Sequence, residues 1–277
     1  MFVFMFMHSK KLQYPAKPDR PDPIMARRLQ EILGGQWGEM SVMNMYLFQG
    51  WNARGNEKYK DLLLDTATEE IGHVEMIATM ISHLLEGAPL SAKEEAVKDP
   101  ATAAIMGGMN PQHAIVSGLG AAPRDSNGNP WTSNYIVSSG NLLADMRMNV
   151  TAESQGRLQV ARLYEMTDDK GIKDMLGFLL ARDTQHQLQW IEAIKELEGK
   201  EGIVVPGQVP ESYEVSDVSH ILYNFSEGED SKKVVDGKKA LDGKEFKYGE
   251  KPEAMGEKPM LKPVSKDVYN TPPSDLL

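Results

Sequence analysis

Apolar residues recur at intervals of three and four along four long stretches of the chain. Residues at these intervals lie on one face of an α-helix, so each stretch predicts an amphipathic helix with its apolar face toward a core. The four predicted helices cover residues 23–51, residues 56–86, residues 134–166, and the stretch from the turn at 167–169 to residue 198.

The predicted helix ends carry residues that commonly cap helices. Asp22 followed by Pro23 is typical of a helix start, because the Asp side chain accepts backbone N–H groups and proline suits the first helical position. Asn56 is the expected cap of the second helix, and Gly87 lies just after its end. Because only a short turn separates the first two helices, we expect them to be antiparallel neighbours.

The connection between the second and third helices is long, covering residues 87–133. A connection of this length suits a crossover between two helical hairpins. The chain therefore predicts an all-α fold, a four-helix bundle of two antiparallel hairpins. The expected organisation is an N-terminal lead at residues 1–22, the bundle at residues 23–200 and an extended C-terminal arm at residues 201–277.

The C-terminal arm loses the helical pattern and is rich in Pro, Gly, Lys and Asp. It has too few large apolar residues to hold a core of its own. Two apolar segments, at 221–225 and 246–248, favour an arm that packs on its own bundle or on a neighbouring subunit, and a disordered tail is the alternative.

The composition excludes several classes of function. The 277-residue chain has a formal net charge of −10, which argues against nucleic acid or an anionic membrane as the main partner. It contains no cysteine, so disulfides, zinc–thiolate sites and thiol nucleophiles are excluded. There is no secretory signal pattern and no apolar run long enough to span a membrane, and we therefore expect a cytoplasmic protein.

Each predicted apolar face carries acidic or imidazole side chains at its centre. An ionised carboxylate on a buried face is costly unless it is paired or binds a metal. In each hairpin one acid is followed, at nearly equal spacing, by a second acid and then by a histidine three residues further on, which is typical of an internal repeat. The residues are Glu39, Glu70 and His73 in the first hairpin, and Glu153, Asp183 and His186 in the second.

The central positions of the four faces meet in one layer of a bundle, so these side chains are expected to form a single cluster. A Glu from each of two helices with a Glu-x-x-His from each of the other two is the ligand set of carboxylate-bridged two-metal bundles. Carboxylate oxygen and imidazole nitrogen suit manganese or iron. We therefore predict a set of protein ligands in which Glu70 is best placed to bridge the two ions. The set is Glu39, Glu70, His73, Glu153 and His186.

Parts of this pattern have plainer interpretations. A single Glu-x-x-His is common as a surface pair or as a satisfied histidine of the core, and Glu153 has Arg157 as a ready partner one helical turn away. Asp183 is one methylene shorter than Glu70, its counterpart in the first hairpin. We therefore expect Asp183 to orient His186 or to take part in proton transfer rather than to bind metal, and a surface acid is the alternative.

A tyrosine is the second candidate catalytic residue, beside Asp183. Tyr46 lies two helical turns after Glu39 on the same face. Its hydroxyl is therefore placed to hydrogen-bond a ligand carboxylate. The alternative is an ordinary core tyrosine at a helix interface.

Four stretches make the chain similar to the manganese catalases, also called non-haem catalases. They are residues 34–39 (GGQWGE), 68–76 (TEEIGHVEM), 139–142 (SGNL) and 178–186 (FLLARDTQH). The resemblance implies a ferritin-like bundle, assembly into homohexamers, and the same set of ligands for two manganese ions per subunit. It also implies conversion of two hydrogen peroxide molecules to water and dioxygen, with the manganese pair cycling between Mn(II) and Mn(III).

Two positions depart from the family pattern. Ala152 stands where some members have an arginine just before the ligand Glu153, and Asp183 stands where Glu is frequent. Both changes affect proton handling and access to the metals. We therefore expect them to alter the turnover rate rather than the type of reaction.

The resemblance also implies a calcium site that joins subunits. Two aspartates one helical turn apart would combine with an oxygen-rich turn in the C-terminal arm. Oxygen ligands of this kind suit a hard cation, and a solvated acidic face is the alternative. The implied calcium ligands are Asp61, Asp65, Asn224, Ser226 and Gly228.

Two other functions fit parts of the pattern. A diiron ferroxidase or oxidase would use the same ligand types, although two Glu-x-x-His motifs would favour it and this chain has only one. A structural protein of the same lineage, such as a spore-coat relative, would hold metal but serve mainly in assembly. Dioxygen release from added peroxide separates these functions.

Overall fold

The chain forms two compact units, Met1–Gln208 and Val209–Leu277, which we describe separately. Their structure is a computed structural model. The residues that it describes are 10–88, 110, 112–201, 211–214, 217–225, 227–239, 243–253, 255, 258 and 260.

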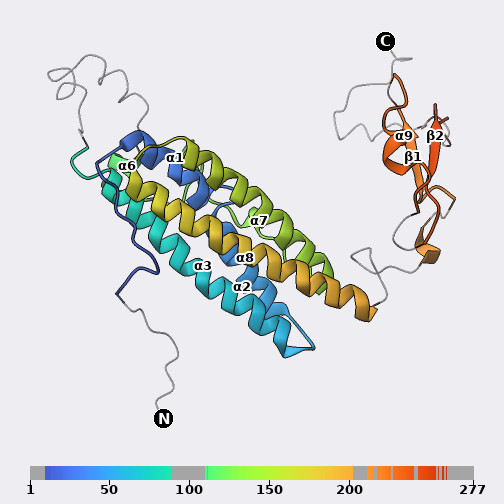
Figure 1. The fold of residues 1–277 in the computed structure, drawn as a ribbon, viewed down its shortest axis with the longest axis horizontal. Coiled ribbons are helices and arrows are strands. Elements are labelled where there is room, and N and C mark those ends of the chain that lie inside the picture. Colours follow the sequence, from blue (N-terminus) through green and yellow to red (C-terminus); the bar gives the residue numbers. More distant parts are fainter. Residues whose placement is uncertain are drawn as a thin grey trace, which may run out of the picture. The chain divides into compact units, whose positions relative to one another are not determined.

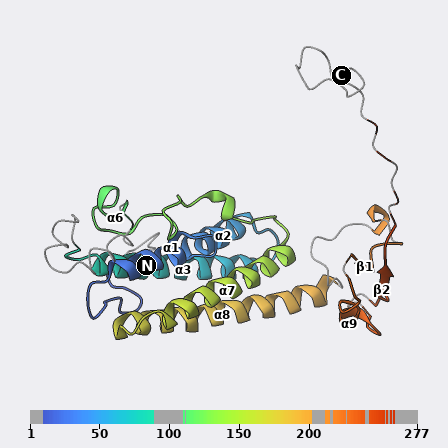
Figure 2. The same cartoon turned by 90° about the horizontal axis from the view of Figure 1, so that it is seen from above.

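The first unit is built around two helical hairpins. Its long helices are α1 (Pro23–Gly34), α2 (Glu39–Asn52), α3 (Glu57–Leu84), α7 (Leu142–Glu165) and α8 (Lys170–Glu201). Helix α2 packs mainly on α3, and α7 packs mainly on α8. Figures 1 and 2 show each pair side by side, with α1 against the end of the bundle. This is the arrangement that the spacing of apolar residues predicted.

The single helix predicted over residues 23–51 is wrong, because the structure has two helices there. Helix α1 ends at Gly34, and the backbone is extended at Gly35 (φ −73°, ψ 174°) before α2 begins at Glu39. A Cβ on Gly34 would lie 2.4 Å from the carbonyl oxygen of Arg124, so only glycine lets the chain pass this close. The break makes Glu39 the first residue of a helix, where the helix dipole favours negative charge.

The third predicted helix, at 134–166, also begins later than expected. Helix α7 starts at Leu142, after Gly140 with its left-handed φ of 78°. The side chain of Asn141 then caps the helix. The start of the predicted range instead falls in a short 3-10 helix, η1 (Ser133–Tyr135).

The predicted caps of the first two helices are confirmed. The carboxylate of Asp22 accepts the backbone N–H groups of Ile24 and Met25 at 3.1 and 2.9 Å. The side-chain oxygen of Asn56 accepts the N–H of Lys58 at 3.0 Å. These bonds satisfy N–H groups that have no partner inside a helix.

Much of the predicted crossover, at 89–109 and 111, lies outside the described residues. The described part contains the short helix α6 (Gln112–Ile115) and then runs beside α1. The side-chain amide of Gln30 in α1 donates to the carbonyl oxygens of Ala122 and Arg124 at 2.8 and 2.7 Å. These bonds tie the crossover to the bundle next to the break at Gly34.

Two apolar clusters fill the bundle and leave a polar layer between them. One cluster includes Ile77 and Leu176, and the other includes Leu63 and Trp190. Along α3, Leu63 precedes Glu70 and Ile77 follows it, so the polar residues interrupt an otherwise apolar core. The helices in the described part of the chain are too short or too polar to cross a membrane.

The second unit contains a two-stranded parallel sheet. Strand β1 (Ile221–Asn224) pairs with strand β2 (Lys247–Glu250). Short helical turns lie at η2 (Glu211–Tyr213) and α9 (Lys232–Val235). The strands overlap the two apolar segments of the C-terminal arm, which the sequence did not assign to a sheet.

Gly34→Ala is expected to lower the free energy of unfolding by about 1–3 kcal/mol, because the added methyl group would overlap backbone atoms of Arg124. Gly177→Ala is the matched control. Gly177 lies inside α8 with open space where a Cβ would be, so alanine is expected to raise that free energy by about 0.5–1 kcal/mol. Urea unfolding at equal protein concentration measures both effects, and equal midpoints would contradict the close approach.

Candidate metal centre

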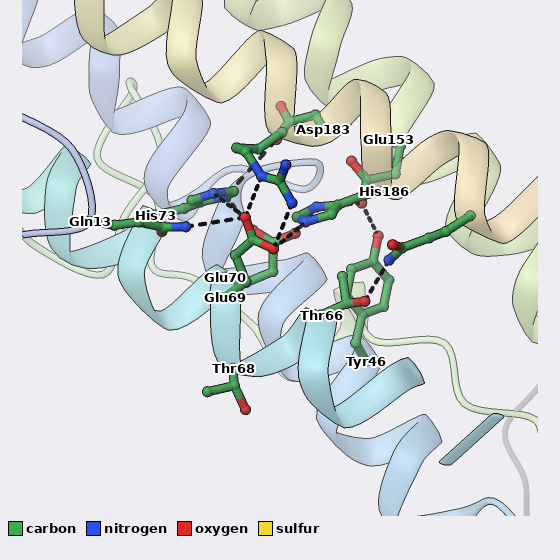
Figure 3. Close-up of polar contacts among 12 residues, drawn as sticks. Gln13, Tyr46, Thr66, Thr68, Glu69, Glu70, His73, Glu153, Asp183 and His186 are labelled. Atoms are coloured by element: carbon green, nitrogen blue, oxygen red, sulfur yellow. Dashed lines mark hydrogen bonds and ion pairs between the residues drawn. The ribbon is translucent and has the colours of Figure 1, made fainter. Parts of the chain in front are cut away.

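The polar side chains that the sequence placed on the apolar faces are all buried and meet inside the bundle. Figure 3 shows Glu70, His73, Glu153, Asp183 and His186 gathered in the space between α3, α7 and α8. Glu39 reaches the same space from the start of α2. The single cluster that the sequence predicted is therefore present in the fold.

Glu70 lies between the two imidazoles. Its Oε2 is 2.6 Å from Nδ1 of His73, and its Oε1 is 2.8 Å from Nδ1 of His186. The two imidazole rings are nearly parallel, with centroids 5.6 Å apart and an interplanar angle of 24°. Each oxygen of one carboxylate thus faces a different histidine, as a bridging ligand requires.

Glu39 and Glu153 each lie near one of the two imidazoles. Glu39 Oε2 is 3.8 Å from Nδ1 of His73, and Glu153 Oε1 is 3.7 Å from Nδ1 of His186. Two groups result, each with its potential ligand atoms within 4.8 Å of one another, and Glu70 belongs to both. The groups are Glu39, Glu70 and His73, and Glu70, Glu153 and His186.

Several polar atoms at this place lack a hydrogen bond of acceptable geometry within the described residues, although the Glu70 oxygens lie close to both imidazoles. They include both carboxylate oxygens of Glu70 and the Nδ1 atoms of His73 and His186. A buried polar atom without a partner costs about 1–3 kcal/mol, and more when the group is charged. A cation at the same place would satisfy these atoms, so the residues fit a metal site.

Burial raises the pKa values of three acidic side chains of the cluster. Burial, together with the charge of Glu70, raises the pKa of Glu39 to about 8. Burial and the charge of Glu70 also raise the pKa of Glu153 well above its usual value. Burial and the charge of Glu39 do the same for Asp183. Without a cation, these carboxylates would therefore tend to hold protons.

The two histidines respond to the same charges in the opposite sense. Burial disfavours the charged form of His73, but Glu70 outweighs it and raises the pKa of His73 to about 12. Burial is likewise outweighed at His186, where Glu69 and Glu70 raise the pKa to about 10. Protons on the imidazoles thus supply the positive charge that a metal would otherwise bring.

Tyr46 and Asp183, the candidate catalytic residues, both border the cluster. The hydroxyl of Tyr46 donates to Glu153 Oε1 at 2.5 Å, and its ring packs on Trp190 with centroids 5.0 Å apart. Asp183 is buried, with its Oδ1 3.9 Å from Nδ1 of His73. The alternative that Asp183 is a surface acid does not agree with this placement.

Arg157 does not pair with Glu153, which was the plainer interpretation of that glutamate. Its Nη1 donates to Oε1 of Gln187 at 2.6 Å, and the amide of Gln187 donates in turn to Ser154 at 2.5 Å. Glu153 instead accepts from Tyr46 and faces His186.

Glu69 is a residue of the centre to which the sequence analysis assigned no role. It lies on the outer side of both imidazoles, with Oε2 3.1 Å from Nε2 of His186 and Oε1 3.8 Å from Nε2 of His73. It was missed because it lies off the predicted apolar face of α3. Its position one helical turn before His73 is the signal that would have found it.

The implied calcium ligands divide between the two units. Asp61 and Asp65 are exposed on α3, whereas Asn224 and Gly228 belong to the second unit, where the amide of Asn224 donates to the carbonyl oxygen of Gly228 at 2.8 Å. Ser226 lies outside the described residues. The calcium site therefore stays a prediction.

Comparison with known proteins decides the family. The family described as "Manganese containing catalase" matches residues 5–275. The chain is a member of the manganese catalase family. A manganese catalase from Bacillus subtilis is 66% identical over 276 residues, which cover 97% of this chain and 99% of the relative. A manganese catalase from Lactiplantibacillus plantarum is 58% identical over 266 residues, covering 96% of this chain and 99% of the relative.

A solved structure agrees with the sequence relatives. The crystal structure of KatB, a manganese catalase from Anabaena, matches with a TM-score of 0.69 at 28% identity and covers 90% of this chain and 100% of that chain. The resemblance and the ferritin-like helical bundle inferred from the sequence are therefore confirmed. Membership favours a manganese catalase over a diiron oxidase or a structural protein.

Manganese binding to the metal-free protein is expected to release protons near neutral pH. The raised pKa values of Glu39, His186 and His73 mean that these groups hold protons which a metal must displace. The apparent association constant should therefore rise with pH, about tenfold per pH unit for each proton displaced.

Titration calorimetry in buffers of different ionisation enthalpy counts the released protons. Above the pKa of Glu39, at about 8, one fewer proton should be displaced. An association constant that does not change between about pH 6 and pH 8 would contradict this electrostatic description.

Proposed function

We propose that this chain converts two hydrogen peroxide molecules into two water molecules and one dioxygen at a centre that holds two manganese ions. The observation that carries the proposal is the position of Glu70. Its two oxygens each face the Nδ1 of a different buried histidine, and a further glutamate flanks each imidazole. Family membership supports manganese over iron, because the donor types alone suit both metals.

The two groups of side chains would each hold one ion. Glu39 and His73 would bind the first, Glu153 and His186 the second, and Glu70 would bridge them. Three ionised glutamates nearly balance the charge of two divalent cations. The remaining positive charge favours small anionic ligands at the open coordination positions.

When bound, the two manganese ions would supply the redox chemistry, a two-electron exchange between the Mn(II) and Mn(III) states. Transfer of two electrons at a time matters because one-electron reduction of peroxide would release hydroxyl radical. Oxidation of one peroxide to dioxygen releases two protons, and reduction of the other to two waters consumes two. The protein therefore needs a group that can hold a proton beside the metals.

Asp183 suits this role. It belongs to neither ligand group, it is buried, and burial with the charge of Glu39 raises its pKa well above the usual value. Within the described residues its Oδ1 has no hydrogen-bond partner, so this oxygen is free to take up a proton. Tyr46 has a different role, because its hydroxyl donates to Glu153 and orients that ligand.

Ala152 is the position at which this chain would differ from those family members that have an arginine there. It is fully buried in the cluster that contains Tyr46 and Trp190. An alanine there cannot supply the charge that the arginine of some family members carries. We expect the difference to affect turnover rather than the products.

The function is tested by measuring dioxygen with an oxygen electrode after peroxide is added to the manganese-loaded, iron-loaded and metal-free protein. The proposal expects one dioxygen for every two peroxide molecules from the manganese-loaded protein and far less from the others. Iron oxidation and storage without gas release would indicate a ferroxidase. A manganese-loaded sample that releases no dioxygen would leave a structural role.

Asp183→Asn is expected to keep the manganese content and to lower kcat by about 100- to 10,000-fold, because the amide cannot accept and return a proton. Asp174→Asn is the matched control on the same helix. Asp174 is exposed and pairs with Lys170, so its loss should leave kcat unchanged. Metal analysis and initial rates of peroxide loss measure both properties, and an unchanged kcat in Asp183→Asn would contradict the assigned role.

Two further expectations follow from the family resemblance, and a third follows from the sequence, which has no secretory signal pattern. They are assembly into a homohexamer, a calcium ion held by the ligands named above, and a cytoplasmic location. Native mass spectrometry with and without a calcium chelator tests the first two. A monomer whose mass is insensitive to the chelator would contradict both.

A further inference from the structure

Glu69 lies beside both histidines of the cluster, on the side that faces away from Glu70. Nε2 of His186 is hydrogen-bonded to Oε2 of Glu69 at 3.1 Å. Nε2 of His73 lies 3.8 Å from Oε1 of Glu69, which is within ion-pair distance but too long for a hydrogen bond. Glu69 and Glu70 are neighbours in α3, so their side chains leave the helix in different directions. Because the two imidazole rings are nearly parallel, one carboxylate can face both at once.

Glu69 is itself held firmly in place. The guanidinium of Arg182 forms two hydrogen bonds to it, from Nε to Oε1 at 2.6 Å and from Nη2 to Oε2 at 3.2 Å. The amide of Gln13, in the N-terminal lead, donates to the same Oε1 at 3.1 Å. Gly72 makes room for this contact, because a Cβ there would lie 2.6 Å from Oε1 of Gln13. Figure 3 shows Gln13 approaching Glu69 from outside the helices.

The N-terminal lead also packs on the aromatic ring that meets His73. Tyr14 stacks on Phe178, with ring centroids 4.6 Å apart and an interplanar angle of 10°. Phe178 in turn meets His73 edge-on, with centroids 6.3 Å apart. Residues far apart in the chain therefore fix the outer surroundings of the imidazoles.

This arrangement suits the chemistry of a metal-bound histidine. A neutral imidazole has one nitrogen that donates a hydrogen bond and one that accepts. Binding a metal through Nδ1 leaves the proton on Nε2, and an ionised carboxylate can only accept. A carboxylate opposite Nε2 thus selects the tautomer that binds metal and holds the ring in the required plane.

We propose that Glu69 is a positioning residue: clamped by Arg182 and Gln13, it accepts a hydrogen bond from Nε2 of His186 and lies at ion-pair distance from Nε2 of His73, so that the Nδ1 atoms of both rings face the two metal ions. This inference rests on the proposed function, because it requires a metal at the cluster. The loss of Glu69 is expected to disturb His186 directly and His73 to a smaller extent.

The test compares the manganese affinity of the wild-type chain with that of Glu69→Gln and Glu69→Ala, by competition with a chelator of known affinity. The matched control is Glu198→Gln. Glu198 pairs with Arg147, and the two side chains are 23% and 37% exposed, against 21% and 36% for Glu69 and Arg182. The control therefore loses an equivalent ion pair that lies away from the imidazoles.

Glu69→Gln is expected to weaken manganese binding by about 10- to 100-fold, and Glu69→Ala by at least as much. Glu198→Gln should bind as the wild type does. The electron paramagnetic resonance spectrum of the manganese(II) pair supplies a readout that a general loss of stability would not move. It should change in the Glu69 variants and stay unchanged in Glu198→Gln.

Arg182→Gln removes the clamp but keeps the carboxylate, and it is the second variant if the Glu69 variants do not fold. It should also weaken manganese binding, by less than Glu69→Gln does. Equal affinity in the wild type and the Glu69 variants, or an equal loss in Glu198→Gln, would overturn the inference. A wild-type chain that binds no manganese would instead overturn the proposed function.

Discussion

The structure depends on burying several carboxylates and two imidazoles together in the dry interior of a helical bundle. Burial and mutual repulsion raise the pKa of Glu39, Glu153 and Asp183, so the layer needs positive charge to keep these groups ionised. Two metal cations would supply that charge and would also satisfy atoms that no hydrogen bond from the described residues reaches. A metal bound at this layer would therefore couple its binding to folding.

Local features of the fold reduce the cost of this layer. The break between α1 and α2 makes Glu39 the first residue of a helix, where the helix dipole favours its charge. Tyr46 donates to Glu153 from inside the core, and Glu69 faces the imidazoles from the outer side. The bundle brings the candidate ligands together, the break places Glu39 at a helix start, and the N-terminal lead and Arg182 hold Glu69 in place.

The apolar spacing predicted the helices and the polar cluster, because a buried helix face leaves a direct period in the sequence. Features that depend on contacts between distant segments were not predictable in this way. The break after Gly34 depends on the approach of Arg124, and the sheet pairs β1 with β2 across a long stretch of chain. Glu69 was missed because it lies off the buried face, although it stands one helical turn before His73.

The most direct test of the central claim is a crystal structure of the manganese-loaded protein with anomalous scattering recorded at the manganese edge. The account predicts two manganese peaks in each chain, one beside Nδ1 of His73 and the other beside Nδ1 of His186, with Glu70 contacting both. A single peak, or peaks only at the protein surface with the glutamates and histidines of the cluster bound to no ion, would contradict it.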